Sequence, residues 1–519
     1  MKIKLLILAM LTVVSVLGCS KKLAGSEISK ISISSYAPQT PILKGIAYNP
    51  VLRIDVIVQN KTTNQAFKKI KYTLNSLAIS EVEKIEAYLS PTSTFSNANL
   101  IGSVTQVAAN GEIPVNLNLT EGMHFIWLSI VLKNEASIQQ KIEMHCTQLI
   151  SQNNQSYSIS QGSSNYVKYS GVSVRKAGEN NVNTYRIPGI ITTDKGTLIS
   201  VYDIRYTGSG DLPGNIDVGM SRSVNGGKTW EAMKVIMDMG TPHDNNGIGD
   251  PAILFDPITK KIFVAALWSK GNRSIAGSLP GISPDTTGQF VIVSSDDDGL
   301  TWSAPYTITP QVKNPIWNLF FNGPGNGIAM QDGKLVFAAQ YWNENKVPYS
   351  TIIYSNDHGT SWNGKILGPK SNTTESQVVE TKPGTLMLNM RDNRGNFRSV
   401  ATTNNMGSTW TEHTTSYSAL PDPVCMGSFI KAKVNLKGTL TDVLFFSNPN
   451  TSAGRYNITI KASLDLGETW LPINQLLIDE RLCYGYSSLT LVDENTVGIL
   501  YEGTKDLYFV KVPVNEIIK

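Results

Sequence analysis

Five copies of one eight-residue pattern constrain the fold of this chain more than any other feature of its 519 residues. The pattern is Ser/Thr-x-Asp/Asn-x-Gly-x-Thr/Ser-Trp, and its copies occupy residues 223–230, 295–302, 355–362, 403–410 and 463–470. The closing tryptophans of successive copies lie 72, 60, 48 and 60 residues apart, and they are five of the nine Trp in the chain. Such recurrence indicates a repeat architecture.

Each copy is typical of a hairpin turn. An Asp or Asn side chain accepts hydrogen bonds from backbone N–H groups across the turn, and the glycine supplies a positive φ. The Trp then begins the next strand and packs over the turn. The spacing is that of one four-stranded sheet, and sheets of this size repeated around an axis form a β-propeller. We therefore predict a propeller over residues 165–519, in which the copies are structural and do not by themselves fix the blade number.

The part of the chain before the repeats has the pattern of an antiparallel β-sandwich. A chain of this length is too long for one ordinary domain. Apolar residues alternate with polar ones at 51–58, 113–119 and 125–132, with Asn, Gly and Pro between these runs. We predict a sandwich over residues 20–162, a Ser/Asn/Gln-rich linker at 151–164, and an all-β fold throughout.

The first residues predict export. A short basic region precedes the apolar stretch 5–17, which is too short to span a bilayer as a mature helix. The sequence Leu-Gly-Cys-Ser at 17–20 resembles a bacterial lipobox. We therefore predict that residues 1–18 are a signal peptide and that Cys19 becomes a lipidated N-terminus. This reading gives an exported lipoprotein of the periplasm or outer membrane, held on the membrane by its lipid anchor.

Charge and cysteine content argue against other classes of function. The net charge of +4, without a polybasic run, gives no sign of a nucleic-acid partner. Three cysteines follow Cys19, so at most one disulfide can form, and whether Cys425 and Cys483 pair is left open. The five His are scattered and no Cys/His cluster has zinc spacing, so the sequence predicts no metal site.

The stretch Tyr-Arg-Ile-Pro-Gly at 185–189, which opens the repeat region, carries the first candidate for ligand binding. Pro188 fixes its own φ and donates no N–H, so the backbone after Arg186 is stiff. A stiff backbone can aim a guanidinium, and an aimed guanidinium binds a planar anion through two parallel hydrogen bonds. Arg186 is therefore a candidate anion-binding residue.

Together, these motifs resemble those of bacterial exo-alpha-sialidases (neuraminidases). The repeated pattern is similar to the sialidase Asp-box, and residues 185–188 are similar to the Arg-Ile-Pro motif of that family. The resemblance covers about residues 165–519 and implies a six-bladed β-propeller with the active site in a central depression. The N-terminal part resembles the β-sandwich that precedes the propeller in some bacterial sialidases, which implies a carbohydrate-binding domain. With the lipobox, the whole chain looks like a Bacteroides-like lipoprotein sialidase.

The resemblance also implies roles for single residues. It implies that three arginines hold the carboxylate of sialic acid and that a glutamate braces the first of them. Tyr486 matches the family nucleophile, although Tyr484 is left open as a competitor. Its partner base is matched by Glu375, whereas Glu380 is expected to be structural. The full set is Arg186, Arg391 and Arg455 for the carboxylate, Glu502 as the brace, Tyr486 and Glu375 as nucleophile and base, Asp211 as the acid, and Arg205 and Asp250 near the bound sugar.

The implied function is hydrolysis of terminal sialic acids from glycoproteins, glycolipids or oligosaccharides, with retention through a tyrosyl-enzyme intermediate. The implied mechanism needs no cofactor or metal, and a monomer is expected. Two alternatives remain: a trans-sialidase, and a non-catalytic propeller lipoprotein that binds sialoglycans. The complete set of candidate residues favours an enzyme over a binding protein.

Overall fold

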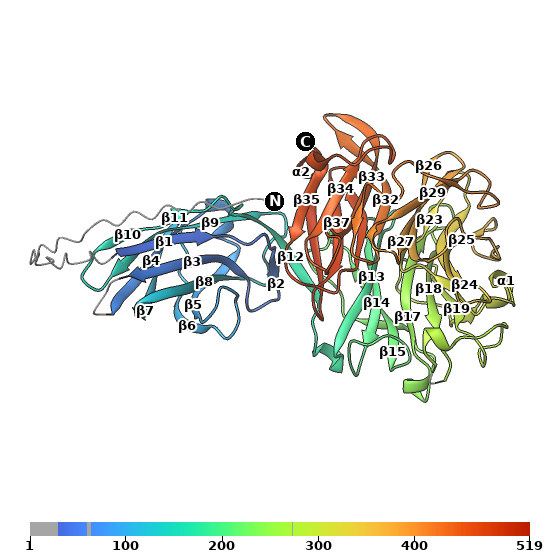
Figure 1. Cartoon of the computed structure of the whole chain (residues 1–519), viewed down its shortest axis with the longest axis horizontal. Coiled ribbons are helices and arrows are strands. Elements are labelled where there is room, and N and C mark those ends of the chain that lie inside the picture. Colours follow the sequence, from blue (N-terminus) through green and yellow to red (C-terminus); the bar gives the residue numbers. More distant parts are fainter. Residues whose placement is uncertain (1–29, 60–63, 272) are drawn as a thin grey trace, which may run out of the picture.

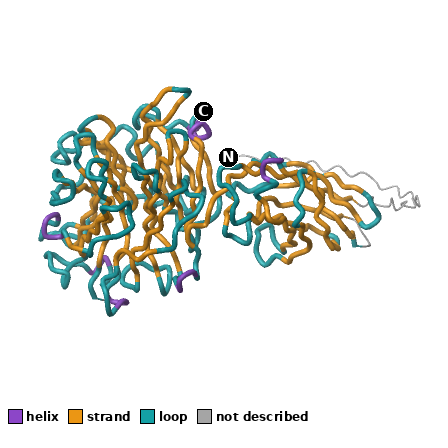
Figure 2. Tube along the Cα trace, turned by 180° about the vertical axis from the view of Figure 1, so that it is seen from behind, coloured by secondary structure: helices purple, strands orange, loops and turns teal. Residues whose placement is uncertain are grey.

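The structure of the chain is a computed structural model that describes residues 30–59, 64–271 and 273–519 (Figure 1). The predicted signal peptide and Cys19 lie outside these residues. The described chain consists almost entirely of β-strands, which confirms the all-β prediction, and it forms a β-sandwich followed by a propeller (Figure 2). Among the described residues, no helix is long and apolar enough to cross a bilayer.

Two sheets face each other in the sandwich. One has the order β11-β1-β3-β8-β5-β6, and the other contains β7, β4 and β9, with β10 paired to β9. The strands are β1 (Lys30–Tyr36), β3 (Pro50–Gln59), β4 (Gln65–Leu74), β5 (Val82–Ser90), β6 (Asn99–Val104), β7 (Asn110–Leu119), β8 (Gly122–Leu132), β9 (Lys141–Ser151), β10 (Ser156–Ser158) and β11 (Ser160–Gln161), and η1 (Ser76–Ala78) is a short 3₁₀ turn. The three alternating runs of the sequence lie in β3, β7 and β8, and their apolar members fill the core between the sheets.

The polar stretch 151–164 is not the linker that its composition predicted. Within it, β10 pairs antiparallel with β9, and β11 pairs parallel with β1. A short strand at the edge of a sheet is held by backbone hydrogen bonds and has little side-chain area to bury, so Ser, Asn and Gln suit it. Composition alone could not distinguish such an edge from a linker.

Six sheets arranged as blades make up the propeller. Blade 1 contains β13 (Thr184–Thr192), β14 (Leu198–Arg205), β15 (Ile216–Ser223) and β16 (Lys234–Met237), and blade 2 contains β17 (Ile248–Phe255), β18 (Ile262–Trp268), β19 (Gln289–Ser295) and β20 (Tyr306–Thr307). In blade 3 the inner strand is in two parts, β21 (Leu319–Asn322) and β23 (Ile328–Ala329), which both pair with the second strand, β24 (Leu335–Trp342), and the third strand is β25 (Pro348–Ser355). Blade 4 contains β26 (Thr373–Lys382), β27 (Thr385–Asp392), β29 (Ser399–Thr403) and β30 (Thr411–Glu412); blade 5 contains β32 (Ser428–Leu436), β33 (Thr439–Pro449), β34 (Ile458–Ser463) and β35 (Gln475–Asp479).

Blade 6 joins the two ends of the propeller. It contains β36 (Ser487–Asp493), β37 (Thr496–Glu502), β38 (Leu507–Pro513) and, as its outer strand, β12 (Val167–Arg175) from the start of the propeller. The smaller elements are β2 (Ile42–Lys44), β22 (Gly325–Asn326), β28 (Asn396–Phe397), β31 (Pro421–Asp422), α1 (Thr309–Val312), α2 (Val514–Ile517), η2 (Glu179–Asn181), η3 (His243–Asn245), η4 (Ile275–Gly277) and η5 (Pro472–Asn474).

The repeated turns follow the third strand of blades 1 to 5. In the third copy, Ser355 Oγ donates to Asp357 Oδ1 at 2.7 Å and accepts the N–H of Gly359 at 2.8 Å, and Asp357 Oδ1 accepts the N–H of Ser361 at 2.9 Å. The other four copies make the same three bonds. Blade 6 needs no such turn because its outer strand, β12, is supplied from the N-terminal side of the propeller.

The turn glycines also set the distance between blades. Gly359 has φ of +84°, and a Cβ at this position would lie 2.3 Å from the ring of Phe263 in blade 2. Trp362 of the same turn contacts the Phe263 ring edge-on, with the ring centroids 6.1 Å apart. Each turn therefore closes a hairpin and also seats its blade against the preceding one.

The sandwich and the propeller share one continuous sheet through β12. Residues 167–169 of β12 pair with β9 of the sandwich, and residues 171–175 pair with β38 of blade 6. Strand β2 adds a parallel pairing to β12, and its Leu43 is fully buried in the core formed by blades 5 and 6. The side chain of Lys168, only 2% exposed, donates to the backbone carbonyls of Pro38 and Asn165. The two parts are thus joined through a packed and hydrogen-bonded junction.

Replacing Gly359 tests the packing role of the repeated turns. We expect Gly359→Ala to lower the free energy of unfolding by about 1–2 kcal/mol for its left-handed backbone, and by about 1–3 kcal/mol more for the overlap with Phe263. Gly384→Ala is the matched control, since Gly384 also has a positive φ of +75° but its added Cβ would meet nothing within 4 Å. Urea unfolding of both variants measures the difference, and equal losses would contradict the packing role.

Calorimetry tests the shared sheet. We expect a chain that begins at residue 30 to unfold in one transition, and a fragment that begins at Asn165 to unfold at a lower temperature. The fragment loses the pairing of β12 with β9 and β2 and exposes the site of Leu43 in the propeller core. Two separate transitions in the longer chain, with the fragment as stable as the second of them, would show that the junction contributes nothing.

Candidate active site

A cavity of about 250 Å³ lies where the N-terminal ends of the inner strands meet. It is lined by Arg186, Ile187, Asp211, Asp250, Ile275, Phe321, Gln340, Trp342, Thr374, Glu375, Arg391, Asn393, Arg455 and Tyr486. The inner and third strands of a blade run in the same direction, so the repeated turns at the ends of the third strands lie at the opposite end of the propeller. The site and the structural turns are therefore separated.

Three inner strands carry irregularities where they border the cavity. The ladder shifts between Arg186 and Gly189 in β13, between Gly249 and Ala252 in β17, and between Thr373 and Ser376 in β26. Ile187 and Asp250 have φ of 56° and 57°, which is an unusual conformation for a β-branched residue such as Ile187. Irregularities of this kind re-aim side chains, and here they direct residues of three blades into one cavity.

The arginine clamp consists of Arg186, Arg391 and Arg455, which come from blades 1, 4 and 5 and all line the cavity. Arg186 Nε donates to Glu502 Oε1 at 3.1 Å, and its guanidinium stacks over the rings of Tyr484 and Tyr486, at 4.7 and 5.3 Å from their centroids. Arg455 donates to the backbone carbonyls of Tyr484 and Val424. These contacts fix two of the guanidinium groups before any ligand binds.

Arg391 differs from the other two clamp arginines because it donates hydrogen bonds to both Glu375 and Tyr486. Its Nη1 donates to Glu375 Oε2 at 2.5 Å and to the hydroxyl of Tyr486 at 3.1 Å. Its buried Nε has no hydrogen-bond partner among the described residues. Arg391 also lines the cavity, so its guanidinium is suited to hold an anion there.

Glu502 lies behind the cavity and is fully buried. Besides Arg186, its carboxylate accepts the backbone N–H groups of Ile187 and Tyr486, each at 2.9 Å. The sequence had suggested that Glu502 braces the first arginine. The structure shows in addition that the same carboxylate fixes the backbone of Tyr486.

Tyr486 and Glu375 form the central pair of the site. The hydroxyl of Tyr486, in a side chain that is 5% exposed, donates to Glu375 Oε1. Burial raises the pKa of Tyr486 well above 10, the nearby charge of Glu375 raises it further, and Arg391 and Arg186 oppose both effects. The phenol is therefore neutral at pH 7, with an acceptor in place for its proton.

Asp211 lies on the loop between β14 and β15, and its side chain is 68% exposed at the edge of the cavity. Its Oδ1 accepts a hydrogen bond from Arg205 Nη1 at 2.7 Å and lies 3.7 Å from Arg186 Nη1. Enclosure by the cavity walls raises the pKa of Asp211, but the charges of Arg205 and Arg186 lower it more, and the result lies below the usual 3.8. In the unliganded site this carboxylate is ionised.

Arg205 and Asp250, both predicted near the bound sugar, are placed differently. Arg205 is 2% exposed, does not line the cavity, and holds Asp203 and Asp211. Asp250 does line it, and its backbone N–H donates to Asp203 Oδ1 at 2.8 Å. Burial and the charges of Asp203 and Glu375 raise the pKa of Asp250 well above 3.8. Asp250 therefore offers the cavity a carboxyl group that loses its proton less readily than a free one.

Tyr484, which the sequence left open as a competitor, and Glu380, which was expected to be structural, do not line the cavity. Tyr484 contributes its ring to Arg186 and its carbonyl to Arg455, but it is not a lining residue. Glu380 lies at the opposite end of β26, where it accepts the N–H groups of Gln331 and Gly384. Their contacts are structural.

Half of the cavity wall was not foreseen from the sequence. The missed residues are Ile187, Ile275, Phe321, Thr374, Gln340, Trp342 and Asn393. Thr374 and Asn393 adjoin or nearly adjoin Glu375 and Arg391, and that proximity was the only available signal. Blade 3 supplies Phe321, Gln340 and Trp342 without a recognisable motif. Within the described ranges, no group of three or more His, Cys, Asp or Glu is placed to hold a metal ion.

Comparisons with known proteins identify the family of this chain. Residues 187–480 match the family model of the BNR repeat-like domain, and residues 29–156 match that of the N-terminal domain of BNR-repeat neuraminidase. A sialidase of Bacteroides fragilis is 46% identical over 412 residues, which are 77% of this chain and 75% of that protein. A sialidase of Micromonospora viridifaciens is 33% identical over 63% of this chain and 50% of its own length.

A solved structure extends the likeness to the whole described architecture. The Hadza microbial sialidase Hz136 is 36% identical, covers 93% of this chain and 100% of its own, and superposes with a TM-score of 0.87. The family resemblance inferred from the sequence motifs is thereby confirmed. With its repeat domain and N-terminal domain both matched, the chain belongs to the sialidase family and is a glycoside hydrolase, an exo-alpha-sialidase.

Proposed function

We propose that this sialidase releases terminal sialic acids with retention of configuration, through a covalent intermediate on Tyr486. The observation that carries the proposal is the hydrogen bond from the Tyr486 hydroxyl to Glu375, made beside three arginines in one cavity. Sialylated glycoproteins, glycolipids and oligosaccharides share the same terminal sugar and are the proposed substrates.

The arginine clamp accounts for recognition of the substrate. Sialic acid carries a carboxylate on its anomeric carbon, and guanidinium groups bind carboxylates through short, charge-assisted hydrogen bonds. Arg186 and Arg455 are fixed by protein contacts, and Arg391 lines the cavity with them. The clamp places the anomeric carbon next to Tyr486.

A tyrosine suits this substrate better than the carboxylate nucleophile of most glycosidases. A carboxylate nucleophile would be repelled by the negative charge next to the anomeric carbon, whereas a neutral phenol is not. The cost is weak nucleophilicity, since the pKa of Tyr486 is raised by burial. Glu375 offsets this cost by accepting the proton as the Tyr486 oxygen bonds to the anomeric carbon.

The first step breaks the bond between the anomeric carbon and the leaving oxygen, which takes a proton from Asp211. The substrate's carboxylate offsets the charge of Arg186, so binding raises the pKa of Asp211 toward the value that an acid needs. In the second step Asp211 takes a proton from water, whose oxygen attacks the same carbon. The bond to Tyr486 breaks, and the phenolate recovers its proton from Glu375.

Trapping the intermediate tests the role of Tyr486. A 3-fluoro-sialosyl fluoride should label the enzyme, because its ring fluorine slows both steps while fluoride remains a good leaving group. Mass spectrometry should find the fluorinated sugar on a peptide at Tyr486. Tyr486→Phe should abolish labelling and lower kcat at least about 100-fold, yet still bind a sialic acid analogue through the clamp.

Tyr484→Phe is the matched control. It keeps the ring that stacks on Arg186 and the carbonyl that accepts from Arg455, and it removes only a hydroxyl outside the cavity. This variant should be labelled at nearly the rate of the unchanged enzyme. A label on Tyr484 or Glu375 would overturn the assignment of the nucleophile.

We also propose that the enzyme is an exported lipoprotein anchored through Cys19, on the basis of the lipobox at residues 17–20. A membrane-bound sialidase would act on glycans near the cell surface. Cys19→Ala should move the protein from the membrane fraction to the soluble fraction, as measured by immunoblotting after fractionation. The catalytic rate should not change. Unchanged membrane association would contradict the anchor.

A further inference from the structure

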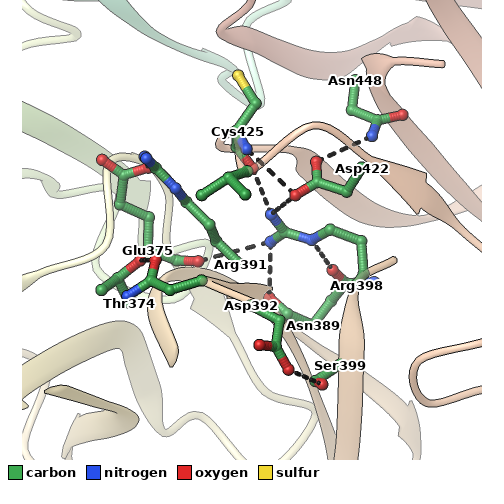
Figure 3. Close-up of polar contacts among 12 residues, drawn as sticks. Thr374, Glu375, Asn389, Arg391, Asp392, Arg398, Ser399, Asp422, Cys425 and Asn448 are labelled. Carbon is green, nitrogen blue, oxygen red and sulfur yellow. Dashed lines mark hydrogen bonds and ion pairs between the residues drawn. The ribbon is translucent and has the colours of Figure 1, made fainter. Parts of the chain in front are cut away.

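A fully buried ion pair lies behind the cavity, in blade 4 and the segment that follows it (Figure 3). It joins Arg398, just before β29, to Asp422 in β31, with Arg398 Nη1 3.6 Å from Asp422 Oδ2. Neither residue lines the cavity. We propose that Arg398 and Asp422 are positioning residues that hold Glu375 and its surroundings in register with Tyr486, an inference that rests on the proposed role of Glu375 as the base.

The local shape of β26 explains why Glu375 needs such support. The ladder pairs Thr373 with Asp392 and Ser376 with Met390, so Thr374 and Glu375 together oppose the single residue Arg391. This bulge turns Glu375 toward Arg391 and the cavity. It also leaves Glu375 without a ladder partner, so the regular sheet does not fix the direction of its side chain.

Arg398 contacts this unpaired segment from behind. Its Nη2 lies 3.5 Å from the backbone carbonyl of Glu375 and 3.2 Å from that of Asn389, and its Nε donates to Asn389 Oδ1 at 2.7 Å (Figure 3). Asn389 lies in β27, two residues before Arg391, and so on the same face of that strand. One guanidinium therefore connects the strand of the base to the strand of the arginine that contacts it.

The same ion pair is also connected to Tyr486, through the backbone of Cys425. Arg398 Nη1 donates to the carbonyl of Cys425 at 2.5 Å, and Asp422 Oδ2 accepts the N–H of Cys425 at 3.1 Å. Cys425 and Met426 then pack against Tyr486 and Ile187 in one buried cluster. Asp422 is itself held by Asn448 Nδ2 at 3.1 Å (Figure 3). The ion pair of Arg398 and Asp422 thus supports both Glu375 and Tyr486.

The charges of Arg398 and Asp422 indicate what this ion pair is for. A buried ion pair is costly to desolvate, and apolar side chains of similar volume often serve stability equally well. The fork of Arg398 can meet four separate carbonyl and amide oxygens in fixed directions, which an apolar side chain or a lysine cannot do. The geometry therefore points to alignment of the site as the use of this pair.

The test replaces Arg398 with Lys in the full chain, which keeps the charge and loses the fork. We expect kcat on a fluorogenic sialoside, and the rate of Tyr486 labelling by 3-fluoro-sialosyl fluoride, to fall about 10- to 100-fold, as misplaced reacting groups do. KM should change little, because Arg186 and Arg455 keep their own contacts. Labelling at the unchanged rate, or a rise in KM with kcat preserved, would overturn the proposal.

Arg222→Lys is the matched control for a general loss of stability. Arg222 is 6% exposed and donates to Asp298 and Glu231 near the repeated turns, at the opposite end of the propeller. It should lower the unfolding temperature but leave kcat and the labelling rate within about twofold, since distant residues with no shared partners couple only weakly. An equal loss of kcat in the two variants, scaling with their loss of stability, would count against a positioning role.

If Arg398→Lys does not fold, Asp422→Asn takes its place, because it keeps the shape of the side chain and removes only the counter-charge. It should show a smaller loss of kcat and of labelling rate, again with little change in KM. Unchanged labelling in a folded Asp422→Asn protein would refute the inference. A failure of the unmodified enzyme to label at Tyr486 would instead refute the proposed nucleophile, and the kcat of the variants would still decide the role of Arg398.

Discussion

The buried carboxylate of Glu502 is the interaction on which the rest of the site depends. It accepts hydrogen bonds from Arg186 Nε and from the backbone N–H groups of Ile187 and Tyr486. These three donors belong to the first blade and to the start of the last, so one side chain links the two ends of the propeller and aligns the first arginine with the nucleophile. A charged acceptor makes strong bonds in a dry interior, and each of its donors would be costly to leave unpaired.

The propeller divides stability and chemistry between its two ends. At one end, five turns repeat the same hydrogen bonds and seat each blade on its neighbour through a glycine. At the other end the inner strands depart from regular pairing, with bulges at Arg186, Asp250 and Glu375. Such departures cost stability, and they persist because buried charged groups such as Glu502 and Arg398 hold the displaced backbone.

Much of the fold could be predicted because its signals are short in range. The turn pattern spans eight residues, and the alternation in β7 or β8 spans about ten, so each element could be recognised locally. Residues of the site that adjoin motifs, such as Arg186 and Tyr486, were found in the same way, and the structure brings them together. Gln340 and Trp342 carried no such signal, because a pocket wall needs only a side chain of suitable size at the right place. Arg205 and Glu502 proved to hold lining residues without lining the cavity themselves.

The sequence by itself determined the class of the fold, the repeated turns, the family and most candidates for the chemistry, because each depends on contacts between residues close together in the chain. Tertiary structure decided how these parts meet. Only the folded chain shows that β12 closes blade 6 and extends the same sheet into the sandwich, and that the polar stretch 151–164 forms edge strands. The family resemblance implied that Glu502 braces Arg186 and that Glu375 partners Tyr486, and the fold makes both contacts, across 316 and 111 residues. Contacts at such separations follow from packing the blades around one axis, and no local pattern of residues encodes them.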